Sequence, residues 1–224
     1  VRGVWGAVTL FDPEDLPKDL SSSFPSSRLP FSRSSSTSSF PSVFTTFRHK
    51  VEKTVPVRAV ASPPPPLAPI PPSVHIGEIP SLSYFTTTFS VPVLPLPDNR
   101  AVMRFEGGED AARARVGSYL WATDSISCYK DTRNGMIGSE YSSKFSPFLA
   151  LGNISPRFIY HEVKRYEQER AANDSTYWLV FELLWRDYFR FACLAFGNSV
   201  FHAYGTAGVG LPVSMPVWAA HAHA

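Results

Sequence analysis

This 224-residue sequence is poor in cysteine, in net charge and in long apolar runs. Its two cysteines, Cys128 and Cys193, have no paired spacing, which excludes a disulfide framework and a cysteine-rich metal site. No apolar run reaches the length of a membrane span, so we expect no membrane association. The net charge of +2 excludes a strong attraction of the whole chain to polyanions, although a local basic strip could still bind nucleic acid.

The start of the chain also lacks familiar signals. It reads Val-Arg-Gly-Val-Trp-Gly, without an initiator methionine or the layout of a signal peptide. We interpret it as the interior of a longer protein whose targeting peptide is not visible. Most of the 21 prolines and many serines lie in the first hundred residues, so a core must come mainly from the second half.

Residues 1–98 predict a long, mostly irregular linker. A short strand is expected at 4–10, and a short helix is expected at 46–53, with Phe44 and Phe47 turned inward. The Ser/Pro-rich stretch 20–42 cannot bury enough apolar area to offset its ordering entropy, so it predicts a flexible insertion.

The prolines between residues 63 and 72 favour extended polyproline structure. They indicate a spacer, and a ligand for a proline-recognition domain is the alternative that remains open.

Residues 99–204 have the pattern of an all-α domain. Acidic residues followed by apolar spacing predict a helix over 111–122, with Val116, Tyr119 and Leu120 on its apolar face. Serine followed by proline at Ser146 and again at Ser155 is a strong signal for the start of a helix. The first of these two helices is expected to end at Leu151 and the second at about Arg170. A last helix is expected from Thr176 to about Phe196, capped by residues 173–175.

The loop 138–147 is the first candidate site, because it places Lys144 and the hydroxyls of Ser142, Ser143 and Ser146 directly before the start of a helix. The first backbone N–H groups of a helix lack internal partners, and the helix dipole there favours negative charge. The loop is therefore suited to phosphate. The alternative is an ordinary helix cap with additional serines.

The second candidate is the pair Tyr129 and Arg133, which would share a face if this segment forms a helical turn. Tyrosine can stack or donate a hydrogen bond, and arginine can bind a phosphate. A surface salt-bridge patch is the alternative.

The third candidate is a stripe of aromatic and charged residues on the last helix. It would contain Trp178, Glu182, Trp185, Arg186, Phe189 and Arg190. Burial of such charges is costly unless they are paired or face a polar cavity. One interpretation is an internal ion pair, either Glu182 with Arg186 or Glu182 with a partner elsewhere. The other is a ligand cavity in which Trp185 stacks and Glu182 hydrogen-bonds.

Taken together, these segments resemble the photolyase/cryptochrome family. The resemblance is carried by YKDTRNGMIGSEYSSKFSPFLALGNISPR at 129–157 and YWLVFELLWRDYFRF at 177–191. RNGM at 133–136, YSSKFSP at 141–147 and NDSTYW at 173–178 are similar to the cryptochrome DASH branch in particular. The resemblance implies the N-terminal half of the family's FAD-binding helical domain, preceded by the linker.

The family resemblance also implies a function. The expected activity is blue-light-dependent repair of cyclobutane pyrimidine dimers in single-stranded DNA by electron transfer from FAD, as in a deoxyribodipyrimidine photo-lyase. A photoreceptor or nucleic-acid-binding regulator on the same fold is the alternative. The branch further implies a folate antenna (methenyltetrahydrofolate), possible binding of RNA, a monomer, and a chloroplast or mitochondrial location.

By motif, the resemblance assigns roles to nine residues of this sequence. Tyr129, Ser142, Ser143, Phe145 and Ser146 would hold the diphosphate or ribose of FAD. Glu182 would hydrogen-bond the flipped dimer, and Trp185 would stack on it. Arg133 and Arg186, together with Trp185, would contact DNA.

Residues 205–224 depart from the family pattern, since they form a low-complexity Gly/Val/Pro/Ala/His sequence where the family continues with helices. We therefore expect an aberrant tail, and a chain that is a fragment lacking the antenna domain and the second half of the FAD domain. Such a fragment is expected to be inactive by itself, and a truncated non-functional product is the third reading of the chain.

Overall fold

A computed structural model describes residues 8–22, 24, 40–62, 66, 68–75, 77–90 and 100–201. Within these residues the fold is helical and contains no strand, which confirms the all-α prediction. The helices are α1 (Lys18–Ser21), α2 (Phe44–Thr54), α3 (Leu82–Thr88), α4 (Glu109–Gly117), α5 (Tyr129–Thr132), α6 (Ser146–Leu151), α7 (Pro156–Glu169) and α8 (Asp174–Phe196). A π-helical turn, Ser118–Ala122, and two 3-10 turns, Ser125–Cys128 and Gly197–Phe201, complete the set.

The long helix α8 is the axis of the fold, and its start is encoded locally. The Asn173 side chain accepts hydrogen bonds from the backbone N–H of Ser175 at 2.8 Å and of Thr176 at 3.0 Å. The Thr176 hydroxyl in turn accepts from the backbone N–H of Asn173, so the two residues form a capping box. The helix ends at Phe196 before Gly197, as the sequence predicted.

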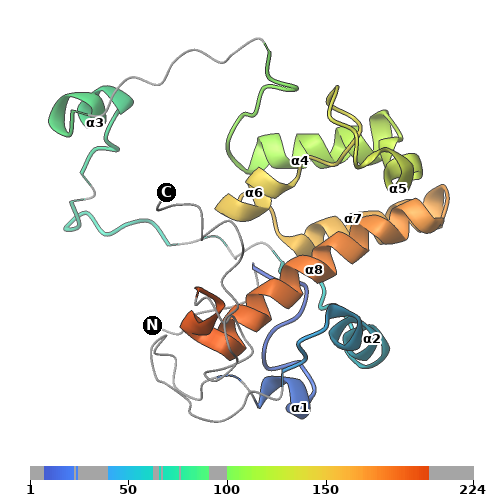
Figure 1. Cartoon of the computed structure of the whole chain (residues 1–224). Coiled ribbons are helices and arrows are strands. Elements are labelled where there is room, and N and C mark those ends of the chain that lie inside the picture. The colour runs from blue at the N-terminus through green and yellow to red at the C-terminus, as the bar shows by residue number, and fades with distance from the viewer. Residues whose placement is uncertain are drawn as a thin grey trace, which may run out of the picture.

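Helix α7 lies beside α8 (Figure 1). The Ser155 hydroxyl accepts a hydrogen bond from the backbone N–H of Arg157, and Pro156 follows at the first helical position. Ile159, Val163 and Tyr166 are buried at intervals of three to four residues, and they form the apolar face of α7.

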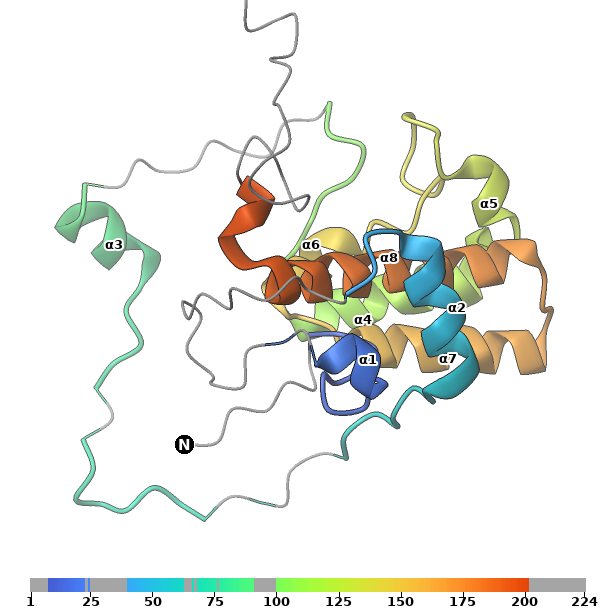
Figure 2. The ribbon, with the colours of Figure 1, turned by 60° about the horizontal axis from the view of Figure 1, so that its bottom comes forward.

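Helix α2 lies across α8 (Figure 2) and packs on it with the predicted face. Phe44, Phe47 and Val51 are buried. Leu10, Phe11, Leu16, Leu20 and Phe40 belong to the same core. The described part of the predicted linker is thus mostly irregular in backbone, yet it covers one side of the helical domain.

Other expectations for the first hundred residues are wrong or fall on residues that the structure does not describe. The described end of the predicted strand, residues 8–10, is not a strand. Helix α3 was not predicted, and it stands apart from the helical body in both views (Figures 1 and 2). Most of the Ser-rich insertion, residues 25–39, and the whole low-complexity tail, residues 205–224, lie outside the described residues.

Candidate functional site

A cavity of about 1070 Å³ opens where α5, the loop before α6, and α8 meet. Figure 1 shows α5 and α6 on the same side of α8. All nine residues to which the family resemblance assigned a role line this cavity, namely Tyr129, Arg133, Ser142, Ser143, Phe145, Ser146, Glu182, Trp185 and Arg186. Trp178, the first residue of the predicted stripe, is not among the lining residues. Residues separated by more than fifty positions are therefore brought together in one site.

The helix predicted from the serine–proline pair is present as α6, but the loop before it does not form an ordinary side-chain cap. Ser146 is already the first residue of α6, and Phe145, the residue before the helix, makes no side-chain cap. The Ser146 hydroxyl is consequently not used as an N-cap, unlike that of Ser155 in α7. Since α6 has only six residues, its dipole contributes little to anion binding.

The backbone of the loop supplies what the short helix does not. Lys144 adopts φ +58°, in the left-handed region, and Phe145 follows with φ −80° and ψ −16°. Consecutive residues of opposite hand turn successive N–H groups toward one side, which forms an anion-binding concavity. The Lys144 ammonium contacts the Tyr141 hydroxyl. A non-glycine residue in this conformation is uncommon and often marks a functional site.

Arg115 on α4 binds the loop before α6 from outside the cavity. It was not among the predicted site residues. Its guanidinium donates to the backbone carbonyls of Ser143 at 3.0 Å, Ser139 at 2.8 Å and Ser142 at 3.2 Å. It also pairs with Glu140 at 2.8 Å. The Arg115 side chain is only 7% exposed. The sequence did carry a signal, since Ala112, Arg115, Val116 and Tyr119 fall in one apolar stripe at i, i+3, i+4 and i+7.

Tyr129 lies at the inner wall of the cavity, in the single turn of α5. Burial, together with the nearby Glu182 carboxylate, raises the pKa of Tyr129 to about 12. The phenol therefore stays neutral at physiological pH and can donate a hydrogen bond. Its ring meets that of Tyr119 edge to face, with 6.4 Å between centroids.

Glu182 pairs with Arg133, which settles the question of its partner. Both side chains are about one-third exposed, 34% and 30%, so the pair faces the cavity and remains accessible. The alternative pair of Glu182 with Arg186 is wrong. Arg186 instead donates to the backbone carbonyls of Val8 and of Leu149, the latter at 3.1 Å.

Trp185 is held by aromatic packing. Phe44 from α2 stacks on its ring, with 3.7 Å between centroids and 13° between planes. Phe189, one turn further along α8, stacks at 5.4 Å and is 58% exposed. Because the indole is fixed by a neighbour from a distant segment, it is preorganised as part of the cavity wall.

The charges around the cavity are mostly positive. Arg133, Lys144, Arg186 and Arg190 line it, against the single carboxylate of Glu182. Burial, followed by repulsion from Arg190, lowers the pKa of Arg186. The net charge of the chain is only +2, yet its basic side chains form a local patch, which the overall composition could not reveal.

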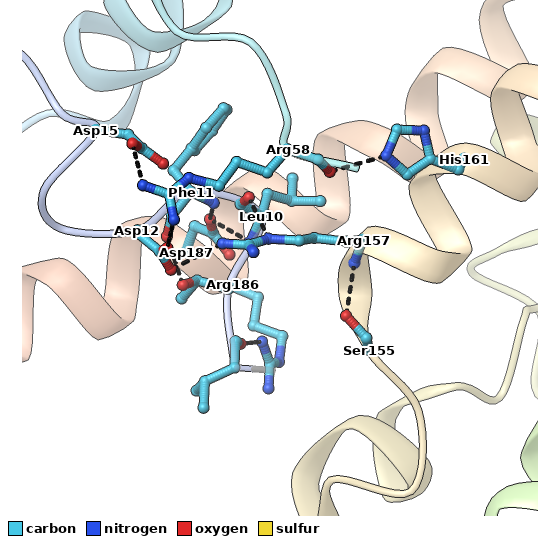
Figure 3. A network of polar contacts seen from close by, with 12 residues as sticks. Leu10, Phe11, Asp12, Asp15, Arg58, Ser155, Arg157, His161, Arg186 and Asp187 are labelled. Carbon is cyan, nitrogen blue, oxygen red and sulfur yellow. Dashed lines mark hydrogen bonds and ion pairs between the residues drawn. The ribbon is translucent and has the colours of Figure 1, made fainter. Parts of the chain in front are cut away.

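A second polar network joins the N-terminal segment to α7 and α8 (Figure 3). The Asp187 carboxylate accepts from the backbone N–H of Leu10 at 2.9 Å and of Phe11 at 3.2 Å. Arg157 donates to the Leu10 carbonyl at 3.0 Å and pairs with Asp12 at 2.8 Å. The sequence did not predict this network, because its members lie up to 177 positions apart.

Within the described residues, no group of His, Cys, Asp and Glu side chains has the arrangement of a metal site. No described helix is long and apolar enough to cross a membrane.

Comparison with known proteins assigns the chain to a family, although no family model matches it. It is 45% identical over 206 residues to "Cryptochrome DASH, chloroplastic/mitochondrial" of Oryza sativa, and 44% identical over 212 residues to "Cryptochrome DASH" of Synechocystis. These alignments cover 92% and 94% of this chain. The crystal structure of a Synechocystis cryptochrome matches 93% of the chain with a TM-score of 0.73 and 44% identity.

The chain belongs to the photolyase/cryptochrome family, and its helices match the helical domain of that family. Within the family it groups with the cryptochrome DASH branch, as the motifs indicated. The chain spans about a third of the length of these curated relatives, 32% of the rice protein and 38% of the Synechocystis protein.

Proposed function

We propose that the chain forms the phosphate-binding and substrate-facing walls of an FAD site in a blue-light-dependent flavoprotein that repairs cyclobutane pyrimidine dimers in single-stranded DNA. The observation that carries this proposal is the convergence of all nine motif residues on one cavity. The repair activity itself is proposed for a longer protein that contains this chain. A folate antenna, binding of RNA, a monomeric state and a chloroplast or mitochondrial location, the last as in the names of several relatives, belong to the same proposal.

The residues of the loop fit the diphosphate of FAD. The hydroxyls of Ser142, Ser143 and Ser146, the Lys144 ammonium and the left-handed turn gather donors for an anion. The cavity volume of about 1070 Å³ is slightly above the usual range of small-molecule sites, about 300–1,000 Å³, and so has room for a dinucleotide. Tyr129 would donate from its neutral phenol to the ribose or the diphosphate.

The α8 wall fits an extruded pair of pyrimidines. Trp185 would stack on a base, and Glu182 would accept a hydrogen bond from a pyrimidine N–H group. Arg133 and Arg186 would bind the flanking phosphates, while Arg133 keeps the Glu182 carboxylate oriented. A dimer costs less to extrude than an intact stacked pair, which favours this class of substrate. Bound FAD would supply the light-driven electron transfer that opens the cyclobutane ring.

FAD binding by the 224-residue chain is the first test. We expect saturable binding in equilibrium dialysis, and a loss of about tenfold in affinity for Ser142→Ala or Ser143→Ala, since a hydrogen bond to a charged group contributes roughly 1.5 kcal/mol or more. Ser83→Ala, in α3 and away from the cavity, is the matched control. A chain that folds and binds no FAD would favour the alternative of a truncated, non-functional product.

Binding of a single-stranded oligonucleotide is the second test. We expect a thymine-dimer oligonucleotide to bind more tightly than its undamaged counterpart. Trp185→Leu keeps apolar bulk against Phe44 but lowers this affinity by roughly tenfold or more, because stacking contributes about 1–3 kcal/mol per base. Trp121→Leu, outside the cavity, serves as control.

Illumination separates repair from regulation. Light-dependent loss of dimers supports the photolyase activity. Binding of the oligonucleotide without such loss, in a longer protein that holds FAD, would favour the regulator.

A further inference from the structure

We infer that Arg115 is a positioning residue that fixes the orientation of the loop 139–146 and thereby points its donors into the cavity. Arg115 does not line the cavity. It acts through the backbone that it binds. The name of the ligand, a phosphate group of FAD, rests on the proposed function. The positioning itself rests only on contacts within the chain.

The direction of the loop follows from the planarity of the peptide bond. In a trans peptide the carbonyl of one residue and the N–H of the next point in opposite directions. The carbonyls of Ser142 and Ser143 point at the Arg115 guanidinium. The N–H groups of Ser143 and Lys144 therefore point away from Arg115, and both of these residues line the cavity.

A guanidinium is suited to this role, because it offers several donors in a rigid plane. Arg115 uses Nε and both terminal nitrogens on four acceptors of the loop, which include three carbonyls within five residues. A lysine in the same place keeps the charge, but its single ammonium cannot reach acceptors spread in this way. The Arg115→Lys variant therefore keeps the positive charge at this position and removes the hydrogen-bond geometry of the guanidinium.

Glu140 holds the guanidinium itself in place. One carboxylate oxygen pairs with Arg115, and the other accepts from Thr123 at 3.3 Å and from Ser125 at 3.4 Å. Burial alone would raise the pKa of Glu140, but the hydrogen bonds from Arg115 and Ser139 keep it below its usual value. The pair stays ionised at neutral pH, so the loop is tied both to α4 and to the turns that follow it.

Backbone order measured by ¹⁵N relaxation tests the positioning without any ligand. In the wild-type chain we expect rigid amides at Ser142, Ser143 and Lys144, with order parameters of about 0.85. In Arg115→Lys these should fall toward about 0.6, the range of flexible segments, while amides of α7 and α8 keep their values. The matched control is Arg113→Lys, two residues earlier on α4, where the arginine is 51% exposed and pairs with Glu109.

Two results would overturn the inference. The first is an unchanged loop in Arg115→Lys. The second is an equal loss of order in the loop, α7 and α8, which would mean that Arg115 only stabilises the fold.

Glu140→Gln gives a milder variant in case Arg115→Lys does not fold. It keeps the three carbonyl contacts, so it should loosen the loop less than Arg115→Lys would. A loop as rigid in Glu140→Gln as in the wild type would also contradict the inference, because the anchoring of the guanidinium would then have no effect on the loop.

Measuring the binding of inorganic pyrophosphate and of FAD tests whether the position of the loop matters for its ligand. We expect Arg115→Lys to weaken both by about tenfold or more, the range seen when a supporting partner of a ligand residue is lost. Arg113→Lys should bind as the wild type does. If the wild-type chain binds neither ligand, the proposed function fails, whereas the relaxation data still decide the role of Arg115.

Discussion

At the scale of single residues, partners in this structure come from distant parts of the chain. Glu182 pairs with Arg133 on α5 although Arg186 lies only one turn away on its own helix. Arg186 reaches the carbonyls of Val8 and Leu149. The sequence identified these side chains as a functional group, because charges in an apolar helix need partners. Spacing along one helix could not choose among those partners.

Asp187 gives a prediction at this scale. Burial raises the pKa of Asp187 to about 8, against the opposing effect of hydrogen bonds from Phe11 and Leu10 and of the charges of Arg186 and Arg157. A folded-state pKa above the unfolded value of 3.8 means that the native state binds the extra proton. Its contribution to stability is therefore complete below about pH 4 and is lost as the pH rises through 8.

Urea unfolding of the wild type and of Asp187→Asn checks this pH dependence. The asparagine can still accept from the backbone N–H groups of Leu10 and Phe11, and it does not titrate. We expect the wild-type midpoint to fall more steeply than that of Asp187→Asn between pH 5.5 and 8.5. Parallel curves over this range would show that Asp187 does not titrate there.

At the scale of elements, local signals located the helices well where a cap and an apolar stripe agree. The starts of α7 and α8 and the end of α8 at Phe196 follow from Ser155, Asn173 and Gly197. The serine–proline signal also located α6 correctly, from Ser146 to Leu151, although no side-chain cap forms there and Ser146 lines the cavity. Helix α3 escaped prediction because so short a helix has little periodicity to detect. The single turn of α5 was considered only as the condition under which Tyr129 and Arg133 share a face, and the structure contains it.

The capping box of α8 gives the element-scale prediction. Asn173→Ala removes the acceptor for two backbone N–H groups at the start of the longest helix. We expect a loss of about 0.5–2 kcal/mol in the free energy of unfolding, measured with urea. Ser155→Ala, which removes a single cap bond from α7, should cost less. An unchanged midpoint for Asn173→Ala would mean that packing alone sets the start of α8.

At the scale of the whole molecule, different sides of α8 are covered by segments from different parts of the chain. The N-terminal segment and α2 bury one side, through Phe44 stacked on Trp185 and through the Asp187 network. The loop before α6 and α5 face the cavity side. A mostly irregular segment thus contributes core residues such as Leu10 and Leu20, which its serine- and proline-rich composition did not suggest.

The distribution of charge gives a prediction for the molecule as a whole. Net charge is only +2, yet four cations gather at the cavity. If Arg133 and Arg186 each bind one phosphate, the logarithm of single-strand affinity should fall with the logarithm of salt concentration with a slope of about −1.4. Arg133→Gln should reduce the slope by about 0.7. Arg165→Gln, on the outer face of α7, should leave it unchanged.

The sequence by itself determined the helical class, the main helix boundaries and nine candidate site residues, which the fold brings to one cavity. These follow from local properties, namely caps, apolar periodicity and motifs of neighbouring residues, together with the family resemblance that the comparisons confirm. Only the tertiary structure decided that Glu182 pairs with Arg133, that Arg115 holds the loop 139–146, and that Asp187 binds the N-terminal segment. The physical reason is that a buried or half-buried polar group must find a hydrogen-bonding or charged partner in three dimensions, and the choice depends on which distant backbone or side chain the fold brings within reach.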